Sequence, residues 1–459
     1  MEGFVSLTNM LRRCPVCPNI PGRYPIEPTG PRPCKVLCIG EAGAKNEDRR
    51  GYPFAGASGK ELDTYYLPRA GLSRDVVGVT NAMKCSLQGY RNPKPEEAAV
   101  CAEFHLAREL REFDPEVIVP MGAVACSLFE PDVSLELHHG MALVRSLYDW
   151  MGIVFPNYHP AAGMRDDLYL THLHNDFPRL EGILRGEIGA DDEPEERPGD
   201  YGMCETRRDV REELMRTSPW EIGLDTETIP LGPAPDARRD KPYMLSWSGR
   251  RDGGRVIMAD RPELLKMFVE WVREKDPLID VHNALFDMPV TQRMGVPLDW
   301  RRIEDTMIDA YHARSLPHGL KALSYRLLKS PMGDYEDLVK PHSLEPQLDW
   351  LADVATHEGI EQPWLKPRQW KVGRKAAHAF TAAANKGAYP QERIKNWIKD
   401  EERDFWAAED AVGKFPWMSL RFVPLEQAVY YAAMDAARTL ELRPKIGEVL
   451  RGMRRNVGA

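Results

Sequence analysis

Four carboxylates and one tyrosine in the second half of the chain have the residue types of a two-metal site: Asp225, Glu227, Asp287, Asp435 and Tyr431. Asp225 and Glu227 are two positions apart at the end of an apolar run. Alternate residues of a strand point the same way, so these two carboxylates converge. Tyr431 and Asp435 are four apart in a strongly helical stretch and share one face. Carboxylates on separate elements can hold two metal ions about 3.5–4 Å apart, which clamp the attacking and leaving oxygens of a displacement.

Cysteines distinguish the first half, because all eight lie between Cys14 and Cys204. Those with ligand-like spacing are Cys14, Cys17, Cys85 and Cys101. A CxxC pair such as the first two is, alone, more often half of a zinc site or a chance pair. Four thiolates can hold either tetrahedral zinc or a 4Fe–4S cluster, and the spacing does not decide between them. Three others lie in apolar runs and are expected to pack in the core: Cys34, Cys38 and Cys126.

Short apolar strands that alternate with helices must position these residues. In the first half we predict strands at 34–40, 117–120 and 154–158, and helices at 96–113 and 122–129. In the second half we predict strands at 221–224 and 278–281, and helices after Asn283 and over 430–439. This alternation predicts two α/β domains with functional loops at the ends of their strands.

The size of the chain and its charge pattern divide it into two parts. A chain of 459 residues is too long for one ordinary core and suits two domains. Between Glu187 and Asp200 there are seven acidic residues and one basic residue, with two prolines and little apolar content. Such a stretch is typical of a linker. We therefore expect domains at 1–185 and 205–459, joined by an acidic linker at 186–204.

The bulk properties exclude several classes of protein. The net charge of −9 gives no overall attraction to nucleic acid, so any contact with DNA must come from local patches. No apolar run approaches the roughly 20 residues that span a bilayer, and we expect no membrane partner. Nothing near Met1 has the apolar core of a signal peptide. A cytoplasmic setting with reduced thiols is expected.

Five segments of the first half occur in the order and spacing of a known family. They are Gly40–Gly43, Gly51–Gly59, Asn81–Cys85, Arg91–Glu97 followed by Cys101, and His159–Arg165. Over about residues 10–185 this set resembles the family 4 uracil-DNA glycosylases, whose pattern is roughly GEAPGxxED, GxPFxGxxG, NxxKC, RxPxPEE, C and HPAAxxR. The resemblance implies a parallel-sheet α/β sandwich. It also implies a structural 4Fe–4S cluster, remote from the chemistry, on Cys14, Cys17, Cys85 and Cys101.

The resemblance further implies the residues of a uracil pocket. Phe54 would stack on a base extruded from the DNA, and Asn81 would read the paired donor and acceptor edge of uracil. His159 would donate a hydrogen bond to a uracil oxygen as negative charge builds on the leaving base. Glu41 would position water or offset cationic character on the sugar, with Glu47 as a second choice.

The turn after Glu41 departs from the family pattern. Ala42 and Gly43 would bring backbone amides close to the uracil, and Arg165 would contact the DNA. However, Gly43 and Ala44 replace a proline and a glycine of the family, which loosens this turn. An alternative therefore stays open, in which the module does not catalyse and serves as a uracil sensor or a docking scaffold for a polymerase.

The carboxylate set of the second half resembles the Tyr-bearing branch of the DEDD exonucleases, and most of all the proofreading domain of family A DNA polymerases. The match covers about residues 205–445 and implies a ribonuclease H-like fold with 3′–5′ exonuclease activity. By this resemblance, two Mg²⁺ or Mn²⁺ ions are held by Asp225, Glu227, Asp287 and Asp435. Tyr431 would orient the attacking water, and Asn283 would help to hold the DNA terminus.

An insertion at about 334–424 separates the last two motifs and is rich in tryptophan: Trp350, Trp364, Trp370, Trp397, Trp406 and Trp417. Residues 364–389 contain six Lys or Arg and no Asp or Glu. Tryptophan with basic residues can stack on single-stranded bases and follow phosphates. Alternatively, the tryptophans form the core of a small helical subdomain with a solvated charged face. Both interpretations remain open at this point.

The combination of the two modules indicates a DNA replication or repair enzyme. The sequence stops at Ala459, where a polymerase domain would begin in the family pattern. We therefore expect the protein to act with a separate family A-type DNA polymerase on uracil-containing DNA and on single-stranded or frayed 3′ ends. A fusion of this kind suggests a phage protein in the host cytoplasm. A repair nuclease without a polymerase partner is the other possibility.

Overall fold

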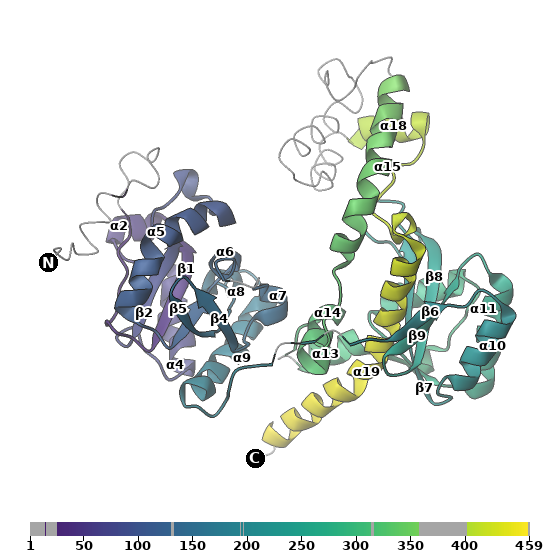
Figure 1. The fold of residues 1–459 in the computed structure, drawn as a ribbon, viewed down its shortest axis with the longest axis horizontal. Helices are drawn as coiled ribbons and strands as arrows, with labels where there is room; N and C mark the ends of the chain where they lie inside the picture. Colours follow the sequence, from purple (N-terminus) through teal and green to yellow (C-terminus); the bar gives the residue numbers. More distant parts are fainter. Residues whose placement is uncertain are drawn as a thin grey trace. The chain divides into compact units, whose positions relative to one another are not determined.

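In the computed structural model of the chain, the described residues are 14, 25–129, 133–192, 194–195, 197–313, 316–357 and 402–457. They form two compact units (Figure 1). The first comprises Met1–Pro194 with Arg314–Pro317, and the second comprises Glu195–Ala313 with His318–Ala459. Among the described residues, no helix is both long and apolar enough to cross a membrane.

The first unit is built on a five-stranded sheet in the order β2-β1-β3-β5-β4. The strands are β1 (Val36–Ala42), β2 (Val77–Met83), β3 (Val117–Pro120), β4 (Leu143–Leu147) and β5 (Trp150–Val154). All neighbours are parallel except β4 and β5, which pair antiparallel. The central strands β1, β2 and β3 are apolar along nearly their whole length, because helices cover both of their faces.

Helices of very different length surround this sheet (Figure 1). The two long helices are α5 (Pro95–Phe113) and α9 (Asp167–Leu184). The short helical segments are α2 (Lys45–Arg50), α3 (Ala57–Glu61), η1 (Leu62–Tyr66), α4 (Leu67–Arg69), η2 (Gln88–Tyr90), α6 (Ala123–Cys126), α7 (Leu135–His138) and α8 (Pro160–Gly163). Four of them, α2, η2, α6 and α8, are the first helical segments after a strand, so they shape the rim where the candidate site residues gather.

Two sequence-based expectations for this unit need correction. The strand expected at 154–158 lies earlier, at Trp150–Val154, where it closes a tight hairpin with β4 through Tyr148, whose φ is 55°. Beyond Val154 the backbone still bonds alongside β3, since Phe155 N–H donates to the carbonyl of Ile118 and Asn157 N–H to that of Pro120, and the chain then reaches His159. The helix expected at 122–129 is only the short α6, Ala123–Cys126.

The second unit contains a six-stranded mixed sheet in the order β11-β10-β7-β8-β9-β6. Its strands are β6 (Asp200–Met203), β7 (Glu221–Ile229), β8 (Lys241–Arg250), β9 (Gly253–Met258), β10 (Leu278–Val281) and β11 (Ile303–Asp305). Strands β7, β8 and β9 form an antiparallel meander, whereas β10 and β11 run parallel to β7. The edge strand β6 lies within 186–204, so part of the expected linker is ordered in the sheet.

Helix α19 (Leu425–Val457) lies across strands β7, β8 and β9 of this sheet (Figure 1). Small residues allow a close approach. A Cβ on Gly223 would lie 2.0 Å from the carbonyl oxygen of Ala436, and a Cβ on Gly254 would lie 2.5 Å from that of Ala433. Because α19 rests directly on the strands, its buried side chains are brought next to β7.

The remaining helices complete the second unit. On the sheet side they are α10 (Arg207–Arg216), α11 (Pro262–Lys275), α12 (Ala284–Arg293), η3 (Trp300–Arg302), α13 (Thr306–Ala313), α14 (Leu320–Leu323), η4 (Ser324–Leu328) and η6 (Leu420–Phe422). In the expected insertion, α15 (Tyr335–His357) and α18 (Glu402–Val412) pack on each other (Figure 1).

Two tryptophans of the insertion behave as the core of a small helical subdomain, and DNA stacking by the insertion stays a prediction. Trp350 packs edge-on against Phe415 at 5.1 Å, and Phe415 against Trp417 at 4.7 Å. Both tryptophans are 5% exposed or less, which is the behaviour of a small helical core. Trp406 is half-buried and lines a surface cavity. The other three, Trp364, Trp370 and Trp397, and the basic segment 364–389 lie outside the described residues.

Candidate functional site

A cavity of about 430 Å³ lies at the carboxyl ends of β1 and β2 in the first unit. Its lining includes residues from all the uracil-pocket segments expected from the sequence: Ala42, Phe54, Asn81, His159 and Arg165. The carboxyl edge of parallel strands is where open α/β sheets commonly bind ligands. The structure therefore gathers, in one place, side chains that are far apart in the chain.

Phe54 and Asn81 approach each other above Gly40 of β1. A Cβ on Gly40 would lie 2.5 Å from Asn81 Oδ1 and 2.6 Å from a ring carbon of Phe54, so only glycine fits there. Phe54 itself has a φ of 55°, which is uncommon for an aromatic residue. Its carbonyl would collide with any Cβ on Gly59. The GxPFxGxxG pattern thus holds Phe54 in an unusual backbone conformation, which fixes the position of its ring.

His159 stacks on Phe54, with ring centroids 5.2 Å apart and planes inclined by 20°. Its Nδ1 accepts a hydrogen bond from the backbone N–H of Ala161 at 3.2 Å, which caps α8. Burial lowers the pKa of His159 to about 4, and the positive charge of Arg165 adds to the shift. The imidazole is therefore neutral near pH 7. Because Nδ1 accepts, the proton resides on Nε2, which is left as a donor.

The two candidate carboxylates have different surroundings. Glu41 is half-buried, and its Oε1 accepts from the backbone N–H of Val124 at 3.4 Å, at the start of α6. Burial raises the pKa of Glu41. Glu47 is buried and accepts from the backbone N–H groups of Ala44 and Gly56, each at 3.2 Å. Glu47 thereby closes the loop that forms the cavity rim, whereas Glu41 is outside the cavity lining.

The altered turn is packed tightly. Gly43 is buried, and a Cβ there would lie 2.0 Å from Ile26 Cδ1 and 3.0 Å from Ser86 Oγ. Ser86 in turn donates a short hydrogen bond to Asp48. The side chain of Ile26 packs against Gly43, so packing fixes the turn although the family's proline is absent. Ala42 lines the cavity, and Gly43 faces away from it.

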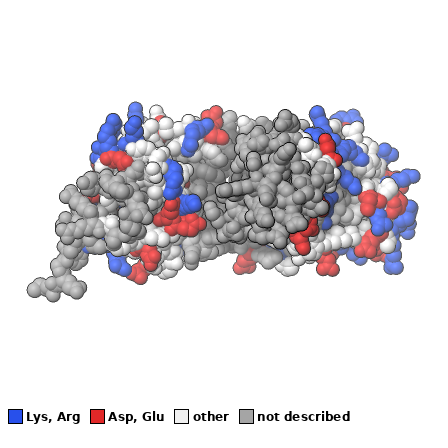
Figure 2. Space-filling model, turned by 90° about the horizontal axis from the view of Figure 1, so that it is seen from above, with Lys and Arg blue, Asp and Glu red and all other residues white. Residues whose placement is uncertain are grey.

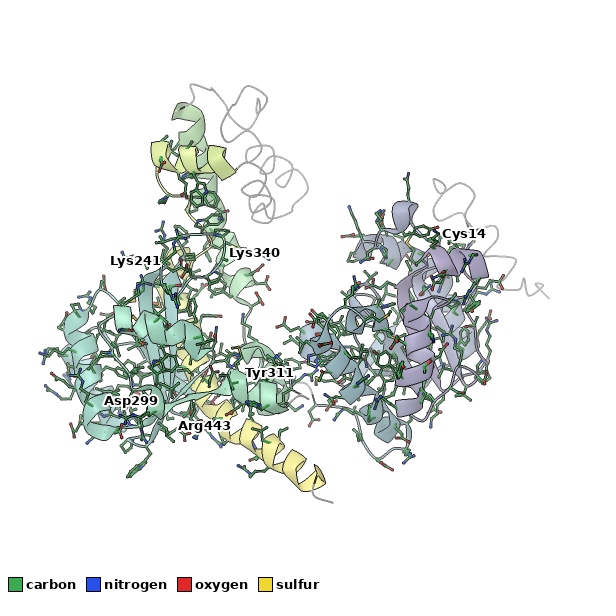
Figure 3. The ribbon with its side chains drawn as sticks, turned by 180° about the vertical axis from the view of Figure 1, so that it is seen from behind. Cys14, Lys241, Asp299, Tyr311, Lys340 and Arg443 are labelled. Carbon is green, nitrogen blue, oxygen red and sulfur yellow. The ribbon has the colours of Figure 1, made fainter. Side chains whose placement is uncertain are left out.

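Two of the expected cluster ligands, Cys101 and Cys14, lie in or against the middle of α5. Cys101 is buried in α5, and its Sγ accepts from the backbone N–H of Lys84 at 3.4 Å, beside Cys85. Cys14 Sγ lies 3.0 Å from Nε2 of His105, one helical turn after Cys101 (Figure 3). Burial lowers the pKa of His105 to about 4, so this imidazole is neutral. The sequence analysis did not single out His105, although it lies four residues after Cys101 and therefore on the same face of the predicted helix.

Cys17 lies outside the described residues. The other free thiols are buried, as expected for core residues: Cys34, Cys38 and Cys126. Burial raises the pKa of all three thiols. Cys204 is likewise buried, in the core of the second unit.

In the second unit, Asp225, Glu227 and Asp435 each offer an oxygen within 4.8 Å of the other two. The first two lie on β7 and the third on α19, whose close packing on the sheet brings them together. Asp225 Oδ2 and Asp435 Oδ1 are buried, and neither has a hydrogen-bond partner among the residues that the structure describes. Orphaned carboxylate oxygens of this kind are costly unless a cation is bound, so the donor set fits divalent metal ions.

Burial and mutual repulsion raise the pKa values of the carboxylates. Burial and the nearby Asp287 raise the pKa of Asp225, and burial and Asp435 raise that of Glu227. Burial raises the pKa of Asp435 to about 7. Asp287, also at about 7 because of burial, accepts hydrogen bonds from the N–H and hydroxyl of Thr226, at 3.1 and 2.6 Å. Asp287 is therefore near the trio and oriented by Thr226, but lies outside the converging group.

Three further residues surround the carboxylates. Tyr431 is buried and hydrogen-bonds Asp435, and burial and Asp435 raise its pKa. Lys321 lies with Nζ 5.6 Å from the centroid of the Tyr431 ring, and its charge acts on both Glu227 and Asp435. Asn283 precedes α12 with a φ of 84°, and its N–H donates to Asp305 at 3.2 Å. No role was expected for Lys321.

Comparison with known proteins identifies the class of the first unit. Residues 27–177 match the Uracil DNA glycosylase superfamily. Among curated relatives, a type-4 uracil-DNA glycosylase of Thermotoga maritima is 32% identical over 165 residues, 35% of this chain and 82% of the relative. One of Archaeoglobus fulgidus is 33% identical over 163 residues, 34% of this chain and 80% of the relative.

A third type-4 uracil-DNA glycosylase, from Saccharolobus solfataricus, is 28% identical over 190 residues, 40% of this chain and 88% of the relative. The chain therefore belongs to the type-4 uracil-DNA glycosylase family. The matched region, like the resemblance noted in the sequence, lies in the first unit.

Proposed function

We propose that the first unit removes uracil from DNA by hydrolysis. The observation that carries this proposal is the shared cavity of Phe54, Asn81 and His159 in a chain of the type-4 family. The extruded uracil would stack on Phe54, and the Asn81 amide would donate to and accept from its edge. The base must leave as an anion when its bond to the sugar breaks, so the site has to stabilise negative charge.

His159 is suited to that task because it is neutral and keeps Nε2–H as a donor. A neutral donor strengthens its hydrogen bond as the uracil oxygen gains charge, without giving up the proton early. Water adds to C1′ of the sugar as the bond to N1 breaks, and its proton goes to the uracil anion. Glu41, whose neighbour Ala42 lines the cavity, or Glu47, which lines it, would orient that water or offset positive charge on the sugar. Arg165 in the lining would contact the phosphates.

We propose a 4Fe–4S cluster on Cys14, Cys17, Cys85 and Cys101. The described ligands fit it chemically, since they are cysteines and two of them, Cys14 and Cys101, lie in or against α5. When bound, the cluster would join the N-terminal segment to α5 and β2 and would supply structure rather than chemistry.

The test is excision of uracil from a single-stranded oligonucleotide in the presence of a chelator, followed by cleavage of abasic sites. Chelation silences a metal-dependent nuclease, so any cleavage reports on the first unit alone. We expect excision from DNA with uracil and none from matched DNA with thymine. Binding of uracil-containing DNA without excision would instead support the alternative of an inactive sensor or docking scaffold.

We propose a second activity, a metal-dependent 3′–5′ exonuclease of the ribonuclease H-like type, in the second unit. The specific observation that favours it is the convergence of Asp225, Glu227 and Asp435 with two orphaned oxygens. The mixed sheet and its covering helix α19 are compatible with this assignment. Asp287, which accepts from Thr226, would complete the ligand set. Two Mg²⁺ or Mn²⁺ ions would stabilise the charge of the attacking and leaving oxygens.

The chain's own residues would orient the reaction. Tyr431 would hold the attacking water through its hydroxyl, and Asn283 would hold the DNA terminus. Attack on the phosphorus breaks the bond to the 3′ oxygen and releases a nucleoside monophosphate. Asp225→Ala should abolish digestion of single-stranded DNA with Mg²⁺ and leave uracil excision intact. The matched control is Asp299→Ala, because Asp299 is exposed and pairs only with Arg301 among described residues. Near-normal digestion by Asp225→Ala would exclude the two-metal assignment.

We further propose that the exonuclease works with a separate family A-type DNA polymerase. A proofreading nuclease needs a frayed 3′ end delivered by a polymerase, or it degrades correct ends too. Co-purification from the native host tests this proposal. If no polymerase is recovered, and matched and mismatched ends are digested alike, a repair nuclease without such a partner is the better interpretation.

A further inference from the structure

The helix that carries Cys101 also carries an imidazole that none of the proposed roles uses. Cys101, His105 and Glu109 are spaced four residues apart in α5 and therefore lie along one face of it. His105 Nε2 lies 3.0 Å from Sγ of Cys14, which comes from 91 residues earlier in the chain. This imidazole therefore contacts one proposed cluster ligand from the helix that holds another.

The chemistry of the two atoms fixes the direction of this contact. A cysteine that binds iron is a thiolate, which has no proton and can only accept a hydrogen bond. An imidazole can donate or accept at a given nitrogen, depending on which nitrogen carries the proton. Beside a thiolate, the proton must lie on the facing nitrogen, so Nε2–H of His105 donates to Sγ of Cys14.

Contacts on both sides of His105 hold the imidazole in this place. One turn later in α5, Glu109 pairs with Lys84 Nζ at 2.6 Å. One turn earlier, Cys101 Sγ accepts from the backbone N–H of Lys84 at 3.4 Å. Because both contacts fix α5 against the residue that follows β2, His105 is preorganised toward Cys14.

Three properties of a protein set the reduction potential of an iron–sulfur cluster: the net charge, the exposure to solvent and the hydrogen bonds to sulfur. Charge beside His105 is balanced, since the Lys84 ammonium is paired with the Glu109 carboxylate. On the face in Figure 2, Lys and Arg are interspersed with Asp and Glu among the described residues, so that surface carries no broad field of one sign. Cys101 and His105 are nearly closed to solvent, at 4% and 3% exposed. Hydrogen bonds to sulfur are therefore the property that a nearby side chain can supply.

We propose that His105 donates an Nε2–H···S hydrogen bond to the Cys14 thiolate and thereby raises the reduction potential of the 4Fe–4S cluster. An added electron increases the negative charge on the cluster and its sulfurs, so a donor stabilises the reduced state more than the oxidised state. Oxidation transfers one electron from the cluster to an acceptor such as ferricyanide, which becomes ferrocyanide. A higher potential makes this transfer less favourable, so His105 protects the cluster from oxidants. The proposal rests on the cluster proposed above and adds a residue that tunes it.

The test measures the reduction potential of the cluster in the full-length protein, by square-wave voltammetry under argon. His105→Leu keeps the volume but removes the donor. It should lower the equilibrium constant for reduction about tenfold, the upper range for one hydrogen bond, which equals about 59 mV for a one-electron couple. His105→Gln keeps an N–H donor and should restore most of the potential. The matched control is His174→Leu in α9, where the imidazole packs on Tyr66, and it should leave the potential unchanged.

A second measurement distinguishes a hydrogen-bond donor from an iron ligand. The protein is labelled with ¹⁵N-histidine, the cluster is reduced, and pulsed EPR records the coupling between the cluster and nitrogen. We expect a weak coupling that His105→Gln removes. A strong coupling would show that His105 binds iron, and no coupling would show that it does not contact the cluster; either result would overturn the proposal. This measurement decides even if His105→Leu loses its iron.

Iron and sulfide analysis separates this outcome from that of the cluster proposal. If the unaltered protein holds zinc or no metal, the cluster and its tuning by His105 both fall. If the unaltered protein and His105→Leu hold equal iron and sulfide and have equal potentials, the cluster stands and the role of His105 falls.

Discussion

Lys84 and Glu109 form a buried ion pair, with Nζ 2.6 Å from Oε2 and neither side chain more than 1% exposed. The same ammonium donates to Thr80 Oγ1 and to the carbonyl of Asn81, both at 2.6 Å. Thr80 also donates to Glu109 at 2.7 Å. The pair therefore joins the end of β2, where Asn81 faces the uracil cavity, to helix α5, which carries Cys101.

Breaking this pair should destabilise the first unit strongly. Lys84→Met leaves Glu109 as an uncompensated buried charge, a loss that typically costs about 3–5 kcal/mol. The double variant Lys84→Met, Glu109→Leu removes both charges and should recover most of that stability. Calorimetry of the first-unit transition measures both effects, with exposed Lys60→Met as the control. If Lys84→Met is as stable as the unaltered protein, the ion pair between Lys84 and Glu109 is not closed to solvent.

The rate of uracil excision should be constant between about pH 6 and 8. Because the folded pKa of His159 is lowered to about 4, the imidazole is neutral throughout that range. Protonation sets in only toward pH 4 and removes the acceptor lone pair that binds Ala161. The unfolded chain binds the proton from about pH 6.5 downward, so His159 also makes the unit less stable as pH falls from 6.5 to 4.

The matched variant is His159→Leu, which keeps the volume but removes the donor. It should lower the excision rate about 10²- to 10³-fold, the usual loss for one donor to a developing oxyanion. Single-turnover rates over a pH series provide the measurement. A rate that falls as pH rises from 6 to 8 would show that a charged imidazole is needed.

Metal-free stability of the second unit should fall as pH rises from about 4 to 7. Asp287 and Asp435 have folded pKa values raised to about 7, above the unfolded value near 3.9. The folded state therefore binds more protons than the unfolded state in this window, and stability decreases with rising pH. Bound Mg²⁺ stabilises the charged carboxylates and should remove the decrease.

Melting temperatures at pH 5.5 and 7.5, with EDTA or Mg²⁺, test this expectation. Asp435→Asn should raise the metal-free stability at pH 7.5, because it removes one of the repelling charges. It should also weaken the stabilisation by Mg²⁺. Equal melting temperatures at the two pH values in EDTA would show that the carboxylates do not repel one another in the folded protein.

The purified protein should be brown, with broad visible absorption from thiolate-bound iron. Cys101→Ser should lose that colour and unfold the first unit, since the cluster joins segments that are distant in the chain. Cys204→Ser should keep the colour, because Cys204 lies in the core of the second unit. Iron and sulfide analysis after anaerobic preparation is the measurement. Colourless protein with stoichiometric zinc would replace the cluster by a zinc site.

The sequence alone was sufficient to predict which candidate residues share a face of a single strand or helix. Asp225 and Glu227 converge because alternate residues of β7 share a face, and Tyr431 and Asp435 share a face of α19. Motif order was also sufficient to place Phe54, Asn81 and His159 together in one cavity. In each case the relevant geometry is local, or is repeated throughout a family with the same strand order.

Only the tertiary structure decided which groups meet across different elements. It turned Asp287 toward Thr226, placed Lys321 beside Tyr431, and buried Lys84 against Glu109. Such contacts depend on how closely helices pack on a sheet, as Gly223 and Gly254 allow for α19. Periodicity shows that a face is buried, but not which side chain lies opposite, because that choice depends on the complementary volumes of residues distant in the chain.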